Sequence, residues 1–167
     1  MSEDADRRFH MGIAAATRGR PDLLLLTDAD IVYAPDMVRT LAARAETGGY
    51  VLTSLMAKLR CESLAERSFI PAFVYFFQML YPFSWVNDPK NRMAAAAGGC
   101  MLIRADALER AGGIAVIRDA LIDDCSLAAV MKKQGAIWLG LTDRVRSIRA
   151  SGALADIHAM VSRSAYA

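Results

Sequence analysis

The chain has 167 residues, of which 54% are apolar and 23% charged, and it carries a formal net charge of +2 at pH 7. Its length fits one domain with a hydrophobic core, and the apolar share lies above the usual globular value, which indicates deep burial or contact with lipid. Because the basic residues are scattered, nothing points to nucleic acid as a partner, and three widely separated cysteines indicate a reducing compartment rather than a metal site.

Helical and strand patterns alternate along the chain, which is typical of an α/β protein. A helix is expected over residues 5–17, and the four leucines at 23–26 predict a short strand covered on both faces, as in parallel sheets. Pro35 opens a second helix that ends at Gly48–Gly49, and residues 50–55 form the next strand. The expected apolar face of this second helix consists of Met37, Val38, Leu41 and Ala42.

The second half of the chain continues the alternation. The remaining expected elements are strand-like segments over 93–97 and 100–103, a short helix over 106–111, a helix over 123–134, a strand over 136–141 and a last helix over 153–167. The helix over 123–134 is the clearest, because acids stand at its start and lysines at its end, where the helix dipole favours them.

An aromatic segment over residues 69–85 is unusual for a soluble enzyme. It is short for a membrane-spanning helix, and two prolines and a glutamine interrupt it. It is either a core helix or a helix in a membrane interface, where tyrosine and tryptophan settle with one end in water. In the second interpretation, the flanking basic residues meet anionic headgroups. These residues are Arg60, Arg67, Lys90 and Arg92.

Two carboxylates, Asp28 and Asp30, follow the leucine strand directly. Ligands of open α/β sheets bind beyond the carboxyl ends of such strands. In an extended segment, residues i and i+2 point to the same side, so both carboxylates can face one ligand. Oxygen ligands at this spacing suit Mg²⁺ or Mn²⁺ held together with a substrate phosphate, although the same residues could simply begin a turn.

Two further groups of residues carry potential chemistry. Gly98 and Gly99 precede a strand that ends in Arg104, and paired glycines let a backbone approach a ligand closely or form a turn. Asp123 and Asp124 open a helix, where acids stabilise the helix by about 0.3–1 kcal/mol without any catalysis. In the functional interpretation, one of these two acids is a general base.

The order of these parts resembles the inverting, family-2 glycosyltransferases of the GT-A fold. The resemblance covers residues 9–167, and its most specific part is the block Leu-Thr-Asp-Ala-Asp-Ile that ends at Ile31. Within this group, the chain is most similar to the hopene-associated glycosyltransferases of bacterial hopanoid gene clusters, which are relatives of the ceramide glucosyltransferases. The resemblance therefore implies a GT-A-type, Rossmann-like mixed sheet flanked by helices.

The resemblance also implies roles for matching residues. Asp28 and Asp30 match the family's Asp-x-Asp motif, in which the second acid binds the divalent metal and the first lies near the ribose or the metal. Asp123–Asp124 matches a Glu-Asp pair whose second member deprotonates the acceptor hydroxyl. The stretch from Gly98 to Arg104 matches the segment that binds donor and acceptor; the binding residues implied are Gly98, Gly99, Cys100 and Arg104.

The implied reaction is metal-assisted transfer of a sugar from a nucleotide-diphosphate donor to a lipid-type hydroxyl. The implied place is the cytoplasmic face of the bacterial inner membrane, with the chain bound peripherally to the membrane surface. Two family features have no counterpart here: the N-terminal nucleotide-binding strands and a downstream Gln-x-x-Arg-Trp-like motif. We therefore expect residues 1–167 to be a single, partial glycosyltransferase domain, truncated at both ends.

Two alternatives remain at this stage. The first is a haloacid-dehalogenase-type phosphatase, which also places Asp-x-Asp after an apolar strand. There, Asp28 would be the nucleophile and Asp30 the acid, with Thr53 or Ser54 binding phosphate and Lys58 or Lys90 clamping charge. Ile31–Val32 replaces the Gly-Thr usual in that class. The second alternative is a catalytically dead fragment that keeps the fold and attaches to a membrane or to a partner.

Overall fold

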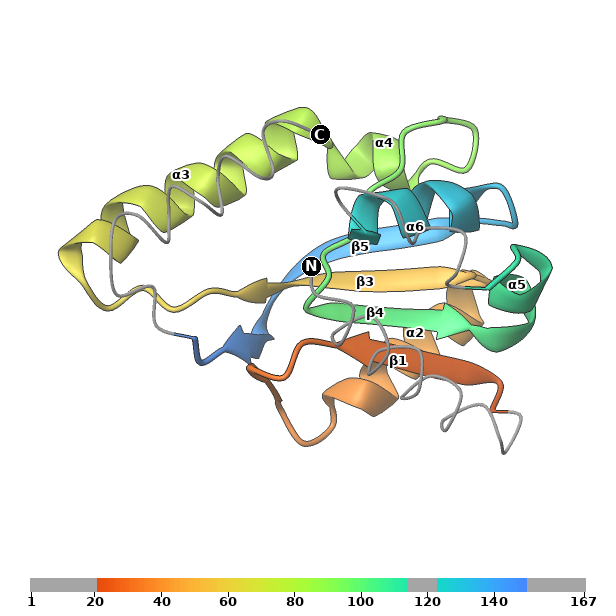
Figure 1. Ribbon diagram of the computed structural model, residues 1–167, viewed down its shortest axis with the longest axis horizontal. Helices are drawn as coiled ribbons and strands as arrows, with labels where there is room; N and C mark the ends of the chain where they lie inside the picture. The colour runs from red at the N-terminus through yellow and green to blue at the C-terminus, as the bar shows by residue number, and fades with distance from the viewer. Residues whose placement is uncertain (1–20, 114–122, 150–167) are drawn as a thin grey trace, which may run out of the picture.

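A computed structural model of the chain describes residues 21–113 and 123–149, which form a five-stranded sheet with helices on both faces (Figure 1). The strands are β1 (Leu23–Thr27), β2 (Ile31–Tyr33), β3 (Leu52–Lys58), β4 (Cys100–Arg104) and β5 (Ile137–Ser147). Their order in the sheet is β1-β4-β3-β5-β2. Strands β3 and β5 pair in parallel, and the other neighbours are antiparallel. The predicted α/β fold with a mixed sheet is thus confirmed.

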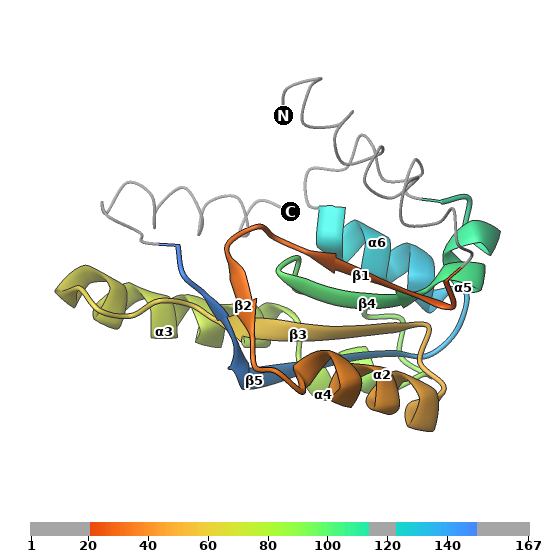
Figure 2. The same cartoon turned by 90° about the horizontal axis from the view of Figure 1, so that it is seen from below.

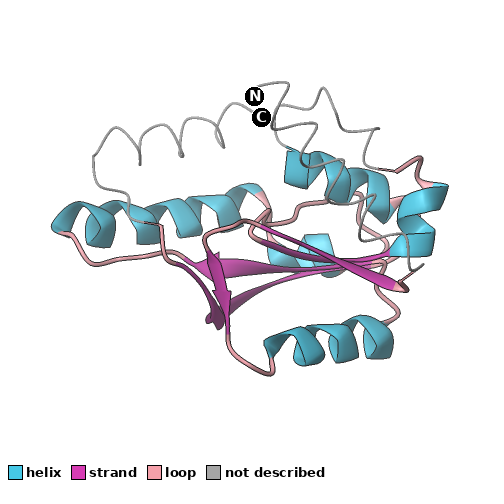
Figure 3. Cartoon of the chain, turned by 60° about the horizontal axis from the view of Figure 1, so that its bottom comes forward, coloured by secondary structure: helices cyan, strands magenta, loops and turns pink. Residues whose placement is uncertain are grey.

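The helices form two layers around this sheet. They are α2 (Met37–Gly48), α3 (Leu64–Leu80), α4 (Phe83–Asn87), α5 (Ala105–Arg110) and α6 (Asp123–Lys132). Helix α2 covers one face and α5 and α6 lie on the opposite side, whereas α4 packs against β5 and α3 extends past the end of the sheet (Figures 2 and 3). The expected helices over 5–17 and 153–167 lie outside the described residues.

Each face of the sheet has its own apolar core. The core under α2 contains Met37, Leu41, Ala45, Leu55, Ala57, Cys100, Leu102 and Val145. The larger core on the other face joins strand residues to Phe73 and Phe77 of α3, Val86 of α4, and Leu127 and Met131 of α6. Because side chains alternate along a strand, β1, β3, β4 and β5 each supply both cores, whereas β2 contributes only to the core under α2.

Strand β1 corrects one expectation. We expected the leucines to be covered on both faces within a parallel sheet, but β1 pairs antiparallel with β4 and ends the strand order of the described sheet. Leu24 and Leu26 are buried in the larger core, whereas Leu23 and Leu25 are only partly buried against the other one. The run of four leucines therefore indicated that β1 contacts both cores, but it did not indicate the direction in which β1 pairs with its neighbour.

Three other expectations differ from the structure. Residues 93–97 form a loop and not a strand, although Ala95 and Ala96 are buried there. The short strand β2 was not expected. Val38 on α2 is exposed, because the buried face of that helix runs through Met37, Leu41 and Ala45. The expected end of α2 is confirmed: Gly49 adopts a left-handed conformation with φ 62°.

Most of the aromatic segment forms α3, which begins at a capping box. The Ser63 side chain accepts the Glu66 N–H, and the buried Glu66 carboxylate accepts the Ser63 N–H. Ile70, Phe73 and Phe77 face the core, whereas Phe69, Tyr75 and Met79 are 50%, 67% and 60% exposed. One face of α3 is thus a core helix face, and large apolar side chains also stand on its outer face.

In residues 21–113 and 123–149, no helix has both the length and the apolar character needed to cross a bilayer.

Candidate active site

Gly98 and Gly99 lie between two carboxylates that are distant in sequence. The Gly98 N–H donates to Asp124 Oδ2 at 2.9 Å. A Cβ atom added at Gly98 would lie 3.4 Å from the same oxygen, and one added at Gly99 would lie 3.8 Å from Asp28 Oδ2. The turn before β4 therefore brings together Asp28, Gly98, Gly99 and Asp124, four of the residues that the sequence singled out.

Side chains from β1 and β2 hold Gly99 in this position. The Thr27 hydroxyl donates to the Gly99 carbonyl at 3.0 Å and accepts the Tyr33 hydroxyl at 2.8 Å. Burial raises the pKa of Tyr33, and the Asp28 carboxylate adds a smaller effect in the same direction. Tyr33 therefore remains a protonated donor at neutral pH. Sequence reasoning missed Tyr33 because β2 was not expected.

Asp30 is held where β2 pairs with β5, two residues after Asp28. Its Oδ2 accepts the Ser147 hydroxyl at 2.6 Å, and its carbonyl accepts the Ile148 N–H at 2.9 Å. The chain turns between Asp28 and Ile31, whose N–H donates to the Asp28 carbonyl at 3.3 Å. The extended geometry that would point both carboxylates to one side is therefore absent here. Ser147 gave no signal in the sequence.

Asp124 is fixed at the start of α6, one residue after Asp123. Besides the Gly98 contact, its Oδ1 accepts the Cys125 N–H at 2.8 Å. Burial and the adjacent Asp124 charge raise the pKa of the Cys125 thiol to about 11. Tyr81, at the end of α3, lies beside this thiol, and its pKa is raised by burial, with Cys125 and Asp124 adding to the effect. The half-buried Asp124 thus faces the glycine turn, and its neighbours, the Cys125 thiol and the Tyr81 hydroxyl, are both protonated.

Two of the predicted binding residues do not reach this turn with their side chains. Cys100 is fully buried in the core under α2, where burial raises the pKa of its thiol, so only its backbone borders the turn. Arg104 ends β4 opposite Leu23, about 13 Å along the strand from Cys100 at the usual rise of about 3.3 Å per residue. Its guanidinium contacts Asp106 at 3.3 Å instead.

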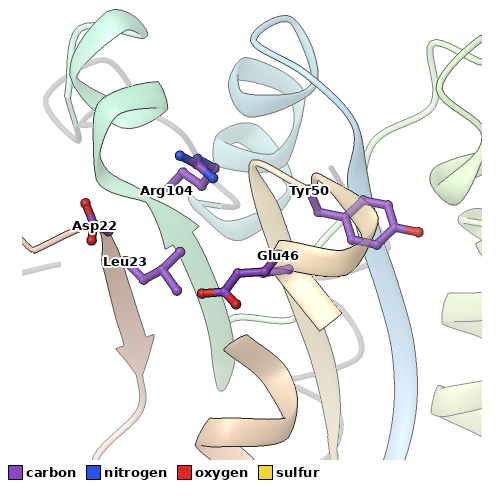
Figure 4. A pocket seen from close by; sticks show the side chains of 6 residues that line it. Asp22, Leu23, Glu46, Tyr50 and Arg104 are labelled. Atoms are coloured by element: carbon purple, nitrogen blue, oxygen red, sulfur yellow. The ribbon is translucent and has the colours of Figure 1, made fainter. Parts of the chain in front are cut away.

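Arg104 lines a separate hollow between α2 and the ends of β1 and β4 (Figure 4). Its other lining residues are Asp22, Leu23, Ala45, Glu46 and Tyr50. Arg104 was grouped with Gly98 because both belong to one short motif, but a strand carries its two ends to opposite edges of a sheet. The expectation that Arg104 joins the glycines is therefore corrected.

The aspartates supply the oxygen donors that a hard divalent cation requires. Within the two described stretches of chain, no three His, Cys, Asp or Glu side chains form a group that could hold a metal ion. Mg²⁺ is commonly held by only one or two carboxylates, with substrate phosphates and water completing its shell. The donor set at Asp28 and Asp30 fits such a shared site in its chemistry, without forming a complete cage.

The phosphatase alternative loses its phosphate-binding residue. Thr53 and Ser54 are fully buried, on opposite faces of β3 within the sheet. Neither hydroxyl can therefore contact a phosphate group bound next to Asp28. The structure thus gives this alternative no Thr or Ser for the role that it assigned to these positions.

Comparison with known proteins gives a family and similarity to solved structures. The family described as Glycosyl transferase family 21 matches residues 10–164. No curated protein matches the chain. Among solved structures, the chain is similar to mannosyl-3-phosphoglycerate synthase from Rubrobacter xylanophilus, with 16% identity and a TM-score of 0.42 over 92% of this chain and 46% of that one. The chain thus spans less than half of that synthase's length.

Proposed function

Because the chain belongs to glycosyl transferase family 21, we propose that it transfers a sugar from a nucleotide-diphosphate donor to a hydroxyl group of a lipid-type acceptor. The observation that carries this proposal is the glycine turn, whose adjacent residues Gly98 and Gly99 lie against Asp124 and Asp28. Two carboxylates at one glycine turn supply one group for the donor and one for the acceptor.

Asp124 is the proposed general base. The acceptor O–H proton passes to its carboxylate while the acceptor oxygen attacks the anomeric carbon of the donor. The bond from that carbon to the diphosphate oxygen breaks, and the diphosphate leaves with the electron pair. Because attack and departure occur on opposite faces, the configuration inverts. A single base suffices here, unlike in glycoside hydrolysis, which uses two carboxyl groups.

Asp30, with Asp28 beside it, is the proposed holder of Mg²⁺ or Mn²⁺. When bound, the ion would neutralise the charge that develops on the leaving diphosphate. Ser147 orients the Asp30 carboxylate through its 2.6 Å hydrogen bond. The turn from Asp28 to Ile31 sets how far the two aspartates stand apart.

The proposed place of action is the cytoplasmic face of a bacterial inner membrane, where the lipid acceptor would lie. The outer face of α3 supports this proposal, because Phe69, Tyr75 and Met79 expose half or more of their surface. Trp85 in α4 is 53% exposed as well, and aromatic side chains favour the membrane interface. We further propose, from the motif resemblance, that the chain acts in hopanoid biosynthesis as a family-2-like, hopene-associated enzyme.

Nucleotide binding tests the donor site. Titration of the chain with UDP and with GDP, with and without Mn²⁺, should show metal-dependent binding of one of them. Asp28→Asn and Asp30→Asn should each weaken that binding at least about tenfold, equivalent to about 1.4 kcal/mol. Asp106→Asn is the matched control, because Asp106 lies with Arg104 at the other end of β4. Binding that is independent of metal and of both aspartates would overturn the donor site.

Transfer assays test the base. With the nucleotide sugar of the bound nucleotide and a bacterial lipid extract, Asp124→Asn should lower kcat at least about a hundredfold while leaving nucleotide affinity unchanged. Binding without any transfer by the unmodified chain would instead support the catalytically dead alternative.

Vesicle flotation tests the membrane partner. Combined substitution of Phe69, Tyr75 and Met79 by serine should reduce the fraction of the protein that floats with anionic vesicles, whereas Val38→Ser on α2 should not. Val38 is also exposed and apolar, but it lies on the other side of the sheet. Equal recovery of all variants would overturn the proposed attachment. Phe73 and Phe77 are unsuitable for this test because both are buried.

A further inference from the structure

One buried hydroxyl spans the turn that carries Gly98 and Gly99. Ser54, in β3, is fully buried, and its Oγ accepts the Ala97 N–H at 2.9 Å. The same Oγ lies 3.2 Å from the Ala97 carbonyl and 3.0 Å from the Cys100 carbonyl. Since a hydroxyl has one proton, it donates to one of these carbonyls at a time. Both ends of the turn thus contact this one side chain, and the Cys100 N–H also donates to the Ala97 carbonyl at 3.2 Å.

The peptide unit between Ala97 and Gly98 connects this hydroxyl to Asp124. Its carbonyl faces Ser54 Oγ, and its N–H donates to Asp124 Oδ2 at 2.9 Å. The unit is planar and trans, so its C=O and N–H point in opposite directions. Ser54 and Asp124 therefore hold one rigid plane from opposite sides. A hydrogen bond on one side also polarises the group on the other.

We propose that Ser54 is a positioning residue, which sets the orientation of the Asp124 carboxylate through the Ala97–Gly98 peptide unit. Its effect on sugar transfer rests on the proposed function, in which Asp124 is the base. The contact between Ser54 and Asp124 through the peptide is independent of that function. Loss of the Ser54 hydroxyl would leave the Ala97 carbonyl with only the Cys100 N–H as a partner, so that the peptide plane rotates and its N–H moves away from the carboxylate.

The neighbouring residue provides a matched control. Thr53 is fully buried like Ser54, but its hydroxyl oxygen has no hydrogen-bond partner within residues 21–113 and 123–149. Thr53→Ala and Ser54→Ala therefore each remove a buried hydroxyl from adjacent positions of one strand. Thr27 still holds the Gly99 carbonyl in both variants, which keeps the far side of the turn attached to the sheet.

Amide hydrogen exchange of the full ¹⁵N-labelled chain tests the proposal directly. In Ser54→Ala the Gly98 amide should exchange at least about tenfold faster, while in Thr53→Ala its rate should match the unmodified chain. Asp124→Asn should shift the Gly98 amide resonance in the unmodified and Thr53→Ala backgrounds, but hardly in Ser54→Ala. Equal Gly98 behaviour in the two alanine variants would overturn the proposal.

A second variant covers the case in which Ser54→Ala does not fold. Ser54→Cys keeps a group of similar shape with a weaker donor, so Gly98 exchange should accelerate about threefold. Exchange as slow as in the unmodified chain would then overturn the proposal.

Kinetics separate this inference from the proposed function. If the chain transfers sugar, Ser54→Ala should lower kcat about tenfold or more at an unchanged KM for the donor, because a misplaced base slows the chemical step. Thr53→Ala should not change kcat, and an equal loss in both variants would overturn the positioning role. If the unmodified chain transfers no sugar, the proposed function fails while the exchange measurements still decide the role of Ser54.

Discussion

The Asn87 side chain makes the hydrogen bonds to β5 that a neighbouring strand would otherwise make, and its removal should destabilise the fold measurably. Its amide accepts the Leu139 N–H at 2.7 Å and donates to the Leu139 carbonyl at 3.0 Å. Leu139 is buried, and β2 pairs with β5 only farther along, at Val145 to Ser147. Asn87→Ala would leave both backbone groups without this partner. Because an unsatisfied buried group costs about 1–3 kcal/mol and water reaches the half-buried Asn87 position, we expect a loss of about 2 kcal/mol.

Urea unfolding followed by circular dichroism measures this loss. For a chain of this size, about 2 kcal/mol corresponds to a decrease in Tm of roughly 4–8 °C. Asn87→Asp keeps the acceptor for the Leu139 N–H but places a second carboxylate oxygen against the Leu139 carbonyl, so it should also destabilise the fold. A change below about 0.5 kcal/mol in Asn87→Ala would refute the reasoning, because surface substitutions commonly stay within that range.

Three further predictions concern single side chains. Thr53→Val replaces the buried hydroxyl, which has no partner in the described part of the chain, by a methyl group and should stabilise the chain by about 1 kcal/mol in urea unfolding. A loss of stability would contradict the conclusion that this hydroxyl makes no hydrogen bond. Burial and the Asp124 charge raise the pKa of Cys125 to about 11, so the rate of its alkylation by iodoacetamide should still increase with pH above pH 9. Asp124→Asn should lower that pKa and speed the alkylation of Cys125 at pH 9. The exposed Cys61 serves as the internal control in the same digest. Gly98→Ala should lower kcat for sugar transfer with little change in the free energy of unfolding, because the added Cβ would lie 3.4 Å from Asp124 Oδ2. An unchanged kcat would show that the carboxylate tolerates the methyl group.

Long apolar or capped segments were the easiest to predict. Helices α2 and α6 and strands β1 and β4 all occur close to their expected positions, because apolar periodicity, glycine stops and end charges act within a few residues. Residues 93–97 were misjudged for a related reason: apolar residues report burial, and a buried loop is as apolar as a strand. Strand β2 was missed because three residues are too few to show a period.

The site was predictable in its residue types but not in its contacts. Asp28, the two glycines and Asp124 stood out because carboxylates and glycines are conspicuous at the ends of apolar segments. Ser54 carried no such signal as a positioning residue, since a serine inside a strand looks like any other. Only the tertiary structure brings Ser54 of β3 next to the Ala97–Cys100 turn.

The sequence by itself determined most of the segments that become helices or strands, where several of them end, and several of the residues that could carry chemistry, because those properties depend on neighbours within one or two turns of chain. Only the tertiary structure decided that β1 pairs antiparallel with β4, that Asp124 meets Gly98 while Arg104 lies at the far end of the strand, and that Asp30 bonds to Ser147. Those contacts join residues far apart in the chain, and their partners are chosen by how the two cores and the sheet pack together.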